Sequence, residues 1–245
     1  MNPDSPQLID SPIDNALGVL LISNGLFFDH VVTTYRANSD ERSCNYVECT
    51  TNRLLSNLAN HLKAHGSSHI SVHNLDTPPF LHSQTLGYLA GIAEYIPGND
   101  IKLDLSQMGI TGICSQGGDH KRESDPKVLG LTLHPKYGGW FAYRGLLVFD
   151  HVKWCDEDQK PKPLRFLSDD QRRDAIIEFN VYPDLGYWRD FNDRSRGPVL
   201  RYSPIQFAYY HEKSSRRRRR ILELLDEERD RTQLPYENTF TTGYS

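Results

Sequence analysis

The chain has 245 residues, which is enough for one globular domain with a substantial core. Its formal net charge of −4 creates no global field that would attract nucleic acid or an anionic membrane. No apolar run approaches the length that spans a bilayer, and the N-terminus lacks the pattern of a secretory signal. The four cysteines are too few and too scattered for a disulfide scaffold, and no Cys-x-x-Cys pair indicates a zinc site. We therefore expect a soluble cytoplasmic protein with no metal site and no contact with membranes or nucleic acid.

The first half of the chain alternates between short apolar runs and helical leucine spacing. The continuous run Leu17–Ser23 predicts a buried strand. Leucines at helical spacing predict an amphipathic helix over Thr51–His65, which Gly66 ends. The alternating segment His69–His73 predicts a second strand. Apolar positions in Ser83–Ile96 predict a second helix, whose two glycines allow another segment to approach closely.

The second half combines a predicted hairpin with two further helices. Val128–His134 and Trp140–Phe149 are β-prone runs joined by Pro-Lys-Tyr-Gly-Gly, which predicts a hairpin with a Gly-Gly turn. A Ser-x-x-Gln capping box predicts a helix over Ser168–Phe179. A last helix begins at Ser214 or Ser215, either of which can cap it.

The mixture of hairpins and separated helices favours an α+β fold over a regularly alternating α/β fold. Both ends of the chain are polar, and we expect residues 1–15 to form a flexible N-terminus and residues 227–245 a flexible tail. One domain is then expected over residues 16–226.

The densest local pattern lies at residues 134–145, with the sequence His-Pro-Lys-Tyr-Gly-Gly-Trp-Phe-Ala-Tyr-Arg-Gly. The sequence holds no Walker motif, no Gly-x-Gly-x-x-Gly, no Gly-x-Ser-x-Gly and no His-Glu-x-x-His, so common nucleotide-binding and hydrolase classes find no support. From the pattern alone, the stretch is an ordinary hairpin in which Arg144 pairs with a carboxylate.

The same stretch resembles, nearly residue for residue, a hairpin of the CblC-type family of cobalamin-processing proteins. In that family an apolar strand leads into His-Pro-basic-aromatic-Gly-Gly-Trp-Phe-Ala-x-Arg-Gly, and a second apolar strand follows. The resemblance extends from about residue 17 to residue 225 and is strongest after residue 128. Further blocks resemble the family in the same order: Gln84–Gly91, Phe179–Asn180, Tyr187–Asp190, and Arg201–Ser203 with Gln206, Ala208 and Tyr209.

The resemblance implies a nitroreductase-like antiparallel sheet flanked by helices. It also implies binding of cobalamin with its dimethylbenzimidazole detached from cobalt, and two reactions. Cyanocobalamin is decyanated with electrons from a reduced flavin, FMN or FAD, and alkylcobalamins are dealkylated by glutathione. A flavoprotein reductase and a downstream cobalamin-trafficking protein are the implied partners, and the implied oligomeric state is a monomer or weak homodimer.

The resemblance also implies site residues but no catalytic side chain, since the hard chemistry belongs to cobalamin. The glutathione-binding arginines correspond to Arg144, Arg189 and one arginine of the run 216–220, with Arg217 the direct alignment choice. The structural alternatives are that Arg189 pairs with Asp190 or Asp193 on the surface, and that the arginine run is a solvated helix face. Core packing explains Tyr143 almost as well as ligand binding does. The cobalamin-binding candidates are Gln84, Tyr88, Gly130, Tyr143, Trp188 and Tyr202.

Two departures from the family keep other functions open. The family has histidine where this chain has Tyr88, and the family's strand-and-helix segment before residue 17 has no counterpart. The first alternative is therefore a cobalamin carrier without catalysis, and the second is a flavin reductase without a corrin role. A third takes the run 216–220 as a nucleic-acid contact, but the acidic residues that follow cancel its local field.

Overall fold

The computed structural model describes residues 16–32, 46–66, 69–73, 82–100, 128–154, 161–197 and 199–232. Of the predicted flexible tail 227–245, residues 227–232 lie in the helix α6 (Ser215–Thr232). Residues 1–15 and 233–245, both predicted to be flexible, and the segment 110–125 lie outside the described residues. Contacts divide the chain into two compact units. The first unit comprises residues 1–26 and 51–201, and the second comprises residues 27–50 and 202–245. The single domain expected over residues 16–226 stays a prediction.

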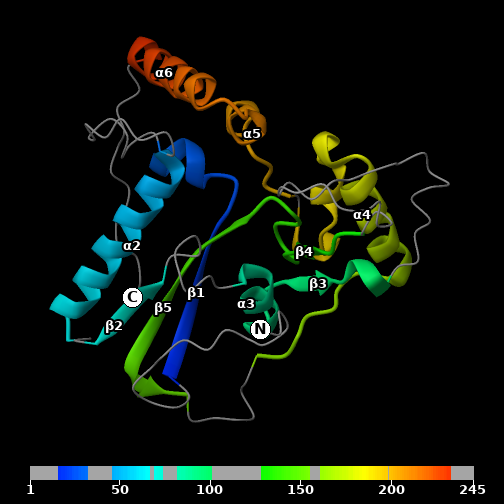
Figure 1. Ribbon diagram of the computed structural model, residues 1–245, viewed down its shortest axis with the longest axis horizontal. Coiled ribbons are helices and arrows are strands. Elements are labelled where there is room, and N and C mark those ends of the chain that lie inside the picture. Colours follow the sequence, from blue (N-terminus) through cyan, green and yellow to red (C-terminus); the bar gives the residue numbers. More distant parts are fainter. Residues whose placement is uncertain are drawn as a thin grey trace, which may run out of the picture. The chain divides into compact units, whose positions relative to one another are not determined.

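The first unit is built on a three-stranded antiparallel sheet with the order β1-β5-β2 (Figure 1). These strands are β1 (Ala16–Ser23), β5 (Ala142–Lys153) and β2 (Ile70–His73). The predicted strands at the start of the chain and at 69–73 are therefore confirmed. The strand β5 pairs with β1 on one side and with β2 on the other, so it is the central strand of this sheet.

Two helices cover opposite faces of this sheet. The helix α2 (Tyr46–Ala64) packs Ala59 and Leu62 against Leu147 and Phe149 of β5. On the other face, residues 146 and 148 of β5 pack with Leu86 of α3 (Ser83–Leu89). This alternation follows the two-residue period of a strand. The helix predicted from the leucine spacing is confirmed, and it begins one turn earlier than predicted.

The helix predicted over Ser83–Ile96 is wrong in its second half. The helix α3 ends at Leu89, and β3 (Glu94–Ile96) follows after a short turn. Gly91 takes a φ of +62°, its N–H donates to the Tyr88 carbonyl at 3.1 Å, and the N–H of Ile92 donates to the Gly87 carbonyl at 3.2 Å. This is a Schellman motif, which ends a helix at a residue with left-handed φ.

The predicted hairpin is also wrong, because its two strands pair with other strands. The strand β4 (Leu131–Leu133) pairs with β3 in a separate two-stranded sheet, whereas β5 pairs with β1 and β2. The tight turn between them does form, with reciprocal backbone hydrogen bonds between His134 and Gly138 at 2.9 and 2.8 Å. Residues 139–141 after the turn carry the chain from one sheet to the other.

The helix α4 (Asp169–Val181) confirms the predicted capping box. Ser168 Oγ accepts from the Gln171 N–H at 3.2 Å, and Gln171 Oε1 accepts from the Ser168 N–H at 3.0 Å. The helix packs residues 175 and 176 against the small sheet in a core that includes Ile96 and Leu133. In the described part of the unit there are also four short 3-10 helices: η2 (Gly98–Asp100), η4 (Pro183–Leu185), η5 (Tyr187–Asp190) and η6 (Arg194–Arg196).

A buried carboxylate fixes the start of α4 against β3. The Glu94 side chain is 2% exposed and forms an ion pair with Arg172 at 3.1 Å. Its second oxygen accepts from the backbone N–H groups of Phe166 and Leu167 at 2.8 and 3.1 Å. Charge and hydrogen bonds together compensate the burial of this group.

The second unit is helical and has its own core. It contains η1 (Phe28–Val32), the first turn of α2, α5 (Pro204–His211) and α6 (Ser215–Thr232). Phe28, Val47, Tyr209 and Leu222 form the buried centre. The N–H of Arg217 donates to Ser214 Oγ at 3.4 Å, so Ser214 caps α6, as one of the two predicted serines.

Helices and antiparallel sheets together confirm the α+β class. Among the described residues, no helix is long and apolar enough to cross a membrane.

Candidate functional site

The predicted site residues of the first unit lie on three connected features: the turn 134–140, the start of β5, and α3. The turn is held from inside by His134, whose Nδ1 accepts from the N–H groups of Lys136 and Tyr137 at 3.0 and 3.3 Å. Burial, reinforced by the positive charges of Arg196 and Lys136, lowers the pKa of His134 to about 4. The imidazole is therefore neutral at physiological pH and serves as a hydrogen-bond acceptor for the turn.

The turn is closed against η5 by backbone and side-chain bonds of Arg189. The Gly139 N–H donates to the Arg189 carbonyl at 2.9 Å, and Arg189 Nη1 donates to the Gly139 carbonyl at 2.6 Å. The guanidinium carbon lies 4.3 Å from the ring centre of Trp188 and 5.5 Å from that of Trp140. Gly138 has a φ of +57°, and a Cβ there would meet the Arg189 carbonyl oxygen at 2.1 Å. The Gly-Gly turn is thus shaped to accept η5.

Asp190 adds a second connection between the same two segments. Its Oδ1 accepts from Trp140 Nε1 at 2.8 Å and from Arg201 Nε at 3.0 Å, and its Oδ2 accepts from Arg201 Nη2 at 2.5 Å. From the sequence, Asp190 is expected only as an alternative surface partner of Arg189, and Arg201 has no predicted role; the structure pairs Asp190 with Arg201. Both belong to blocks that resemble the family, and this was the signal that pointed to them.

Arg144 lies in a bulge of β5. Leu21 pairs with Gly145 and Ile22 pairs with Tyr143, so Arg144 has no opposite residue in the β1 register. Its Nε donates to the buried Ser23 hydroxyl at 2.7 Å. A bulge changes the direction of the side chains beside it, and Arg144 is the bulged residue on this central strand.

The bulge also changes the direction of Tyr143. Residues 147 and 149 face α2, so strict alternation would send Tyr143 to the same face. Its hydroxyl instead reaches α3, where it lies 2.0 Å from the place that a Cβ on Gly87 would occupy. Burial raises the pKa of this phenol, and the nearby Thr132 hydroxyl partly opposes the shift. Neither hydroxyl has a hydrogen-bond partner of good geometry among the described residues.

The helix α3 carries two of the cobalamin-binding candidates. Tyr88 is 37% exposed and Gln84 is half-buried. Gly130, just before β4, packs tightly, since a Cβ there would lie 2.8 Å from the Ile96 carbonyl oxygen and 2.9 Å from Tyr95 Oη. Space for neighbouring backbone therefore explains this glycine without a ligand.

Trp188 is the most core-like of the candidates. Its ring contacts Phe179 edge-on, with ring centres 4.9 Å apart, and packs against the core between α4 and the small sheet. Its buried Nε1 has no hydrogen-bond partner among the described residues. This indole N–H is a donor that a ligand can use.

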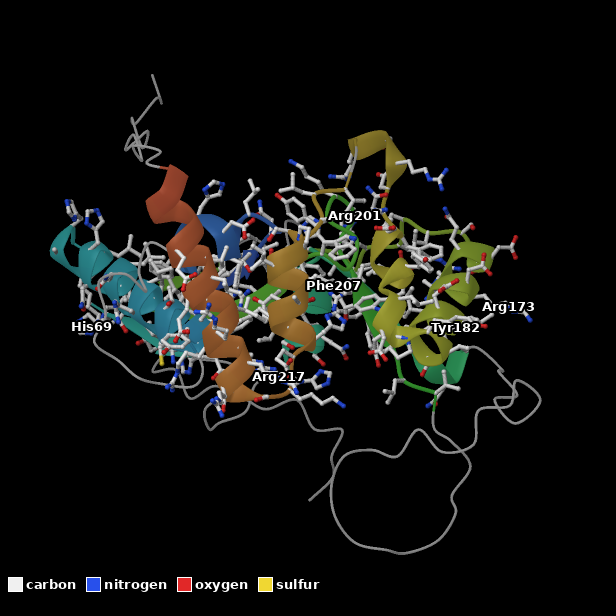
Figure 2. All side chains as sticks on the ribbon, turned by 90° about the horizontal axis from the view of Figure 1, so that it is seen from above. His69, Arg173, Tyr182, Arg201, Phe207 and Arg217 are labelled. Carbon is white, nitrogen blue, oxygen red and sulfur yellow. The ribbon has the colours of Figure 1, made fainter. Side chains whose placement is uncertain are left out.

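Tyr202 and Arg217 belong to the second unit. The Tyr202 ring lies 5.5 Å from that of Tyr210. The Arg217 side chain is 78% exposed, with Nη1 3.6 Å from Glu212 Oε2 (Figure 2). Its neighbours in the run point to different partners, because Arg218 Nε donates to the Glu212 carbonyl and Arg220 pairs with Glu223 and Glu227 at 3.3 and 2.9 Å. The run is therefore divided between helix faces, as the helical period requires.

No resident metal centre is formed by the described residues, in which no group of three or more His, Cys, Asp or Glu side chains is placed to hold an ion. The chemistry that the described residues offer is anion and carboxylate binding by guanidinium groups beside aromatic rings.

Known proteins resemble this chain both in sequence and in fold. The chicken protein named cyanocobalamin reductase / alkylcobalamin dealkylase is 34% identical over 134 residues, which are 54% of this chain and 47% of the chicken protein. A Caenorhabditis elegans MMACHC-like protein is 34% identical over 136 residues, covering 54% of this chain and 44% of its own length. The chain thus matches about half the length of these curated relatives.

A solved structure extends the likeness to most of the chain. The crystal structure of a C. elegans B12-trafficking protein, CblC, superposes with a TM-score of 0.69 at 24% identity, over 91% of this chain and 83% of that one. This likeness shows the fold. The sequence model of one family matches residues 8–222. The chain belongs to the methylmalonic aciduria and homocystinuria type C family.

Proposed function

We propose that this chain processes cobalamin: it binds the cofactor with the benzimidazole detached from cobalt and removes the upper axial ligand. The observation that carries the proposal is the structure of residues 134–145. This stretch resembles the family most closely, and it forms a turn locked to η5 followed by a bulge that holds Arg144. Family membership and the names of the chicken and C. elegans relatives support the same conclusion.

Two reactions are proposed. In dealkylation, the thiolate of glutathione attacks the carbon bonded to cobalt, a carbon–sulfur bond forms, and the electron pair of the broken bond stays on cobalt as cob(I)alamin. In decyanation, a reduced flavin, FMN or FAD, supplies electrons to cobalt and cyanide departs. A flavoprotein reductase as the electron source, and a downstream cobalamin-trafficking protein as the acceptor, complete the proposal.

Glutathione has two carboxylates and a thiol, and guanidinium groups suit both needs. They bind carboxylates in bidentate fashion, and their positive charge favours the thiolate over the thiol. Arg144, Arg189 and Arg217 are the proposed glutathione ligands. Gln84, Tyr88, Gly130, Tyr143, Trp188 and Tyr202 are the proposed cobalamin contacts, with Tyr88 the most exposed of the aromatic ones in the first unit.

Two measurements test the proposal in sequence. Mixing the protein with cob(II)alamin should shift the absorbance spectrum to the base-off form, and methylcobalamin with glutathione should then lose its methyl group under anaerobic conditions. Binding without turnover would make the protein a carrier. A spectrum unchanged by the protein would remove the corrin role altogether.

The cobalt should have no nitrogen ligand from the protein. Tyr88 stands where the family has histidine, and a phenol hydroxyl is a poorer cobalt donor than an imidazole nitrogen. Tyr88→His should therefore change activity only modestly. Electron paramagnetic resonance of the cob(II)alamin complex checks this, because nitrogen superhyperfine splitting in the wild-type spectrum contradicts it.

A further inference from the structure

One carboxylate joins three segments next to the proposed glutathione site. Asp190 lies on η5, and Trp140 lies at the end of the turn 134–140. Arg201, which is labelled in Figure 2, lies at the end of the first unit. The Trp140 indole N–H and the Arg201 guanidinium both donate to this carboxylate, between 2.5 and 3.0 Å. Hydrogen bonds to an ionised acceptor are stronger than neutral ones, so the indole orientation is well fixed.

The fixed indole forms one wall for Arg189. The Arg189 guanidinium carbon lies 5.5 Å from the Trp140 ring centre and 4.3 Å from that of Trp188. The Gly139 carbonyl accepts from one end of the guanidinium. Two rings and one carbonyl thus define the plane in which this guanidinium lies, and bidentate binding of a carboxylate depends on that plane.

Asp190 contacts Trp140 and Arg201. The proposed ligand of glutathione is its neighbour Arg189, so any effect of Asp190 on glutathione binding would be indirect. We propose that Asp190 is a positioning residue, which orients Trp140 so that Arg189 presents its guanidinium to a carboxylate of glutathione. This inference rests on the proposed function. A misplacement of about 1 Å in such a group is enough to reduce binding substantially.

The chain offers a matched control in Asp193. The Asp193 and Asp190 side chains are 31% and 32% exposed, and each forms an ion pair with one arginine. Asp193 binds Ser195 and Arg196 within its own short segment and accepts no hydrogen bond from Trp140. Removing either carboxylate therefore removes one ion pair at a similarly exposed position, but only Asp190 accepts from the indole.

The experiment measures the KM for glutathione and kcat in methylcobalamin dealkylation by the full chain. Asp190→Ala should raise the KM about tenfold and leave kcat within about twofold, since binding is affected and not the cobalt chemistry. Asp190→Asn, which keeps an acceptor for the indole, should recover most of the loss. Asp193→Ala should stay within about twofold of wild type. Trp140→Phe should reproduce the effect of Asp190→Ala, because it keeps a ring and loses the donor.

A double-mutant comparison shows whether Asp190 acts through Arg189. In an Arg189→Ala background, Asp190→Ala should raise the KM no further. An additive effect, or equal effects of Asp190→Ala and Asp193→Ala, overturns the positioning role while the proposed function stands. A wild-type protein that binds cobalamin but shows no glutathione-dependent dealkylation overturns the proposed function and this inference together.

Discussion

Adding one methyl group at Gly87 is expected to separate α3 from β5. A Cβ at this position would lie 2.0 Å from Tyr143 Oη, 2.6 Å from Cζ and 2.8 Å from Cε1, where ordinary contact begins at 3.4 Å. The phenol has little room to retreat, because its ring packs edge-on against Phe141 with centres 5.1 Å apart. Overpacking of this kind costs about 3 kcal/mol, at the upper end of the usual range.

Helix propensity opposes that cost. Alanine is better than glycine within a helix by about 1 kcal/mol. Gly87→Ala should therefore lower the free energy of unfolding by about 2 kcal/mol, which is about 4–8 °C in melting temperature for a chain of this size. Because α3 carries Gln84 and Tyr88, the same variant should also weaken the base-off shift of bound cob(II)alamin.

A second substitution isolates the cause. Tyr143→Leu removes the ring that a Cβ on residue 87 would meet. In that background only the helix propensity remains, so Gly87→Ala should raise the free energy of unfolding by about 1 kcal/mol. Urea unfolding of the four proteins measures this reversal. A Gly87→Ala protein as stable as wild type, or the same change in both backgrounds, would refute the assignment of the glycine to close contact with Tyr143.

Three further perturbations test other parts of the first unit. Arg144→Ala should leave the base-off spectrum of cobalamin intact and remove most glutathione-dependent dealkylation, and an equal loss of both would assign this arginine to the corrin. Glu94→Gln removes the buried charged partner of Arg172, which keeps only the exposed Asp169 at 3.8 Å, and should cost about 3 kcal/mol in urea unfolding. Burial lowers the folded-state pKa of His134 to about 4, below its ordinary value of 6.5, so its stability contribution is present above pH 6.5 and is lost as the pH falls toward 4. In His134→Asn the side-chain oxygen can still accept from the turn. Between pH 6.5 and pH 4, the free energy of unfolding of this variant should therefore fall less than that of the wild type.

Local signals predicted the helices that depend on local contacts. The capping box at Ser168 and the serine cap of α6 bond only to residues of the next turn, so the sequence contains all the information that they need. The structure of residues 83–96 is not decided by contacts within one turn. Its apolar residues satisfy a helical period and also the short strand β3, and the outcome depends on pairing with β4, which lies far away in the sequence.

The candidate site divides in the same way. The position of Arg144 on a strand followed from its apolar neighbours, but the bulge depends on the register of β1, more than a hundred residues earlier in the chain. The approach of Arg189 to Gly139 likewise joins segments that are 50 residues apart. Periodicity within a window cannot contain such contacts, and only the resemblance to the family placed these residues together.

The two glycines of the turn show why the resemblance concentrates in this stretch. A Cβ at Gly138 would overlap the Arg189 carbonyl oxygen at 2.1 Å, and a Cβ at Gly139 would overlap Trp188 Cζ3 at 2.4 Å. A Gly-Gly pair predicts a hairpin turn, yet here it provides the space into which η5 packs. The turn thereby brings Trp140 to Asp190 and, four residues later, Arg144 to the bulge of β5. A Cβ at either glycine would displace the backbone of Arg189 or the ring of Trp188, so the two glycines of the turn are required by the packing of η5.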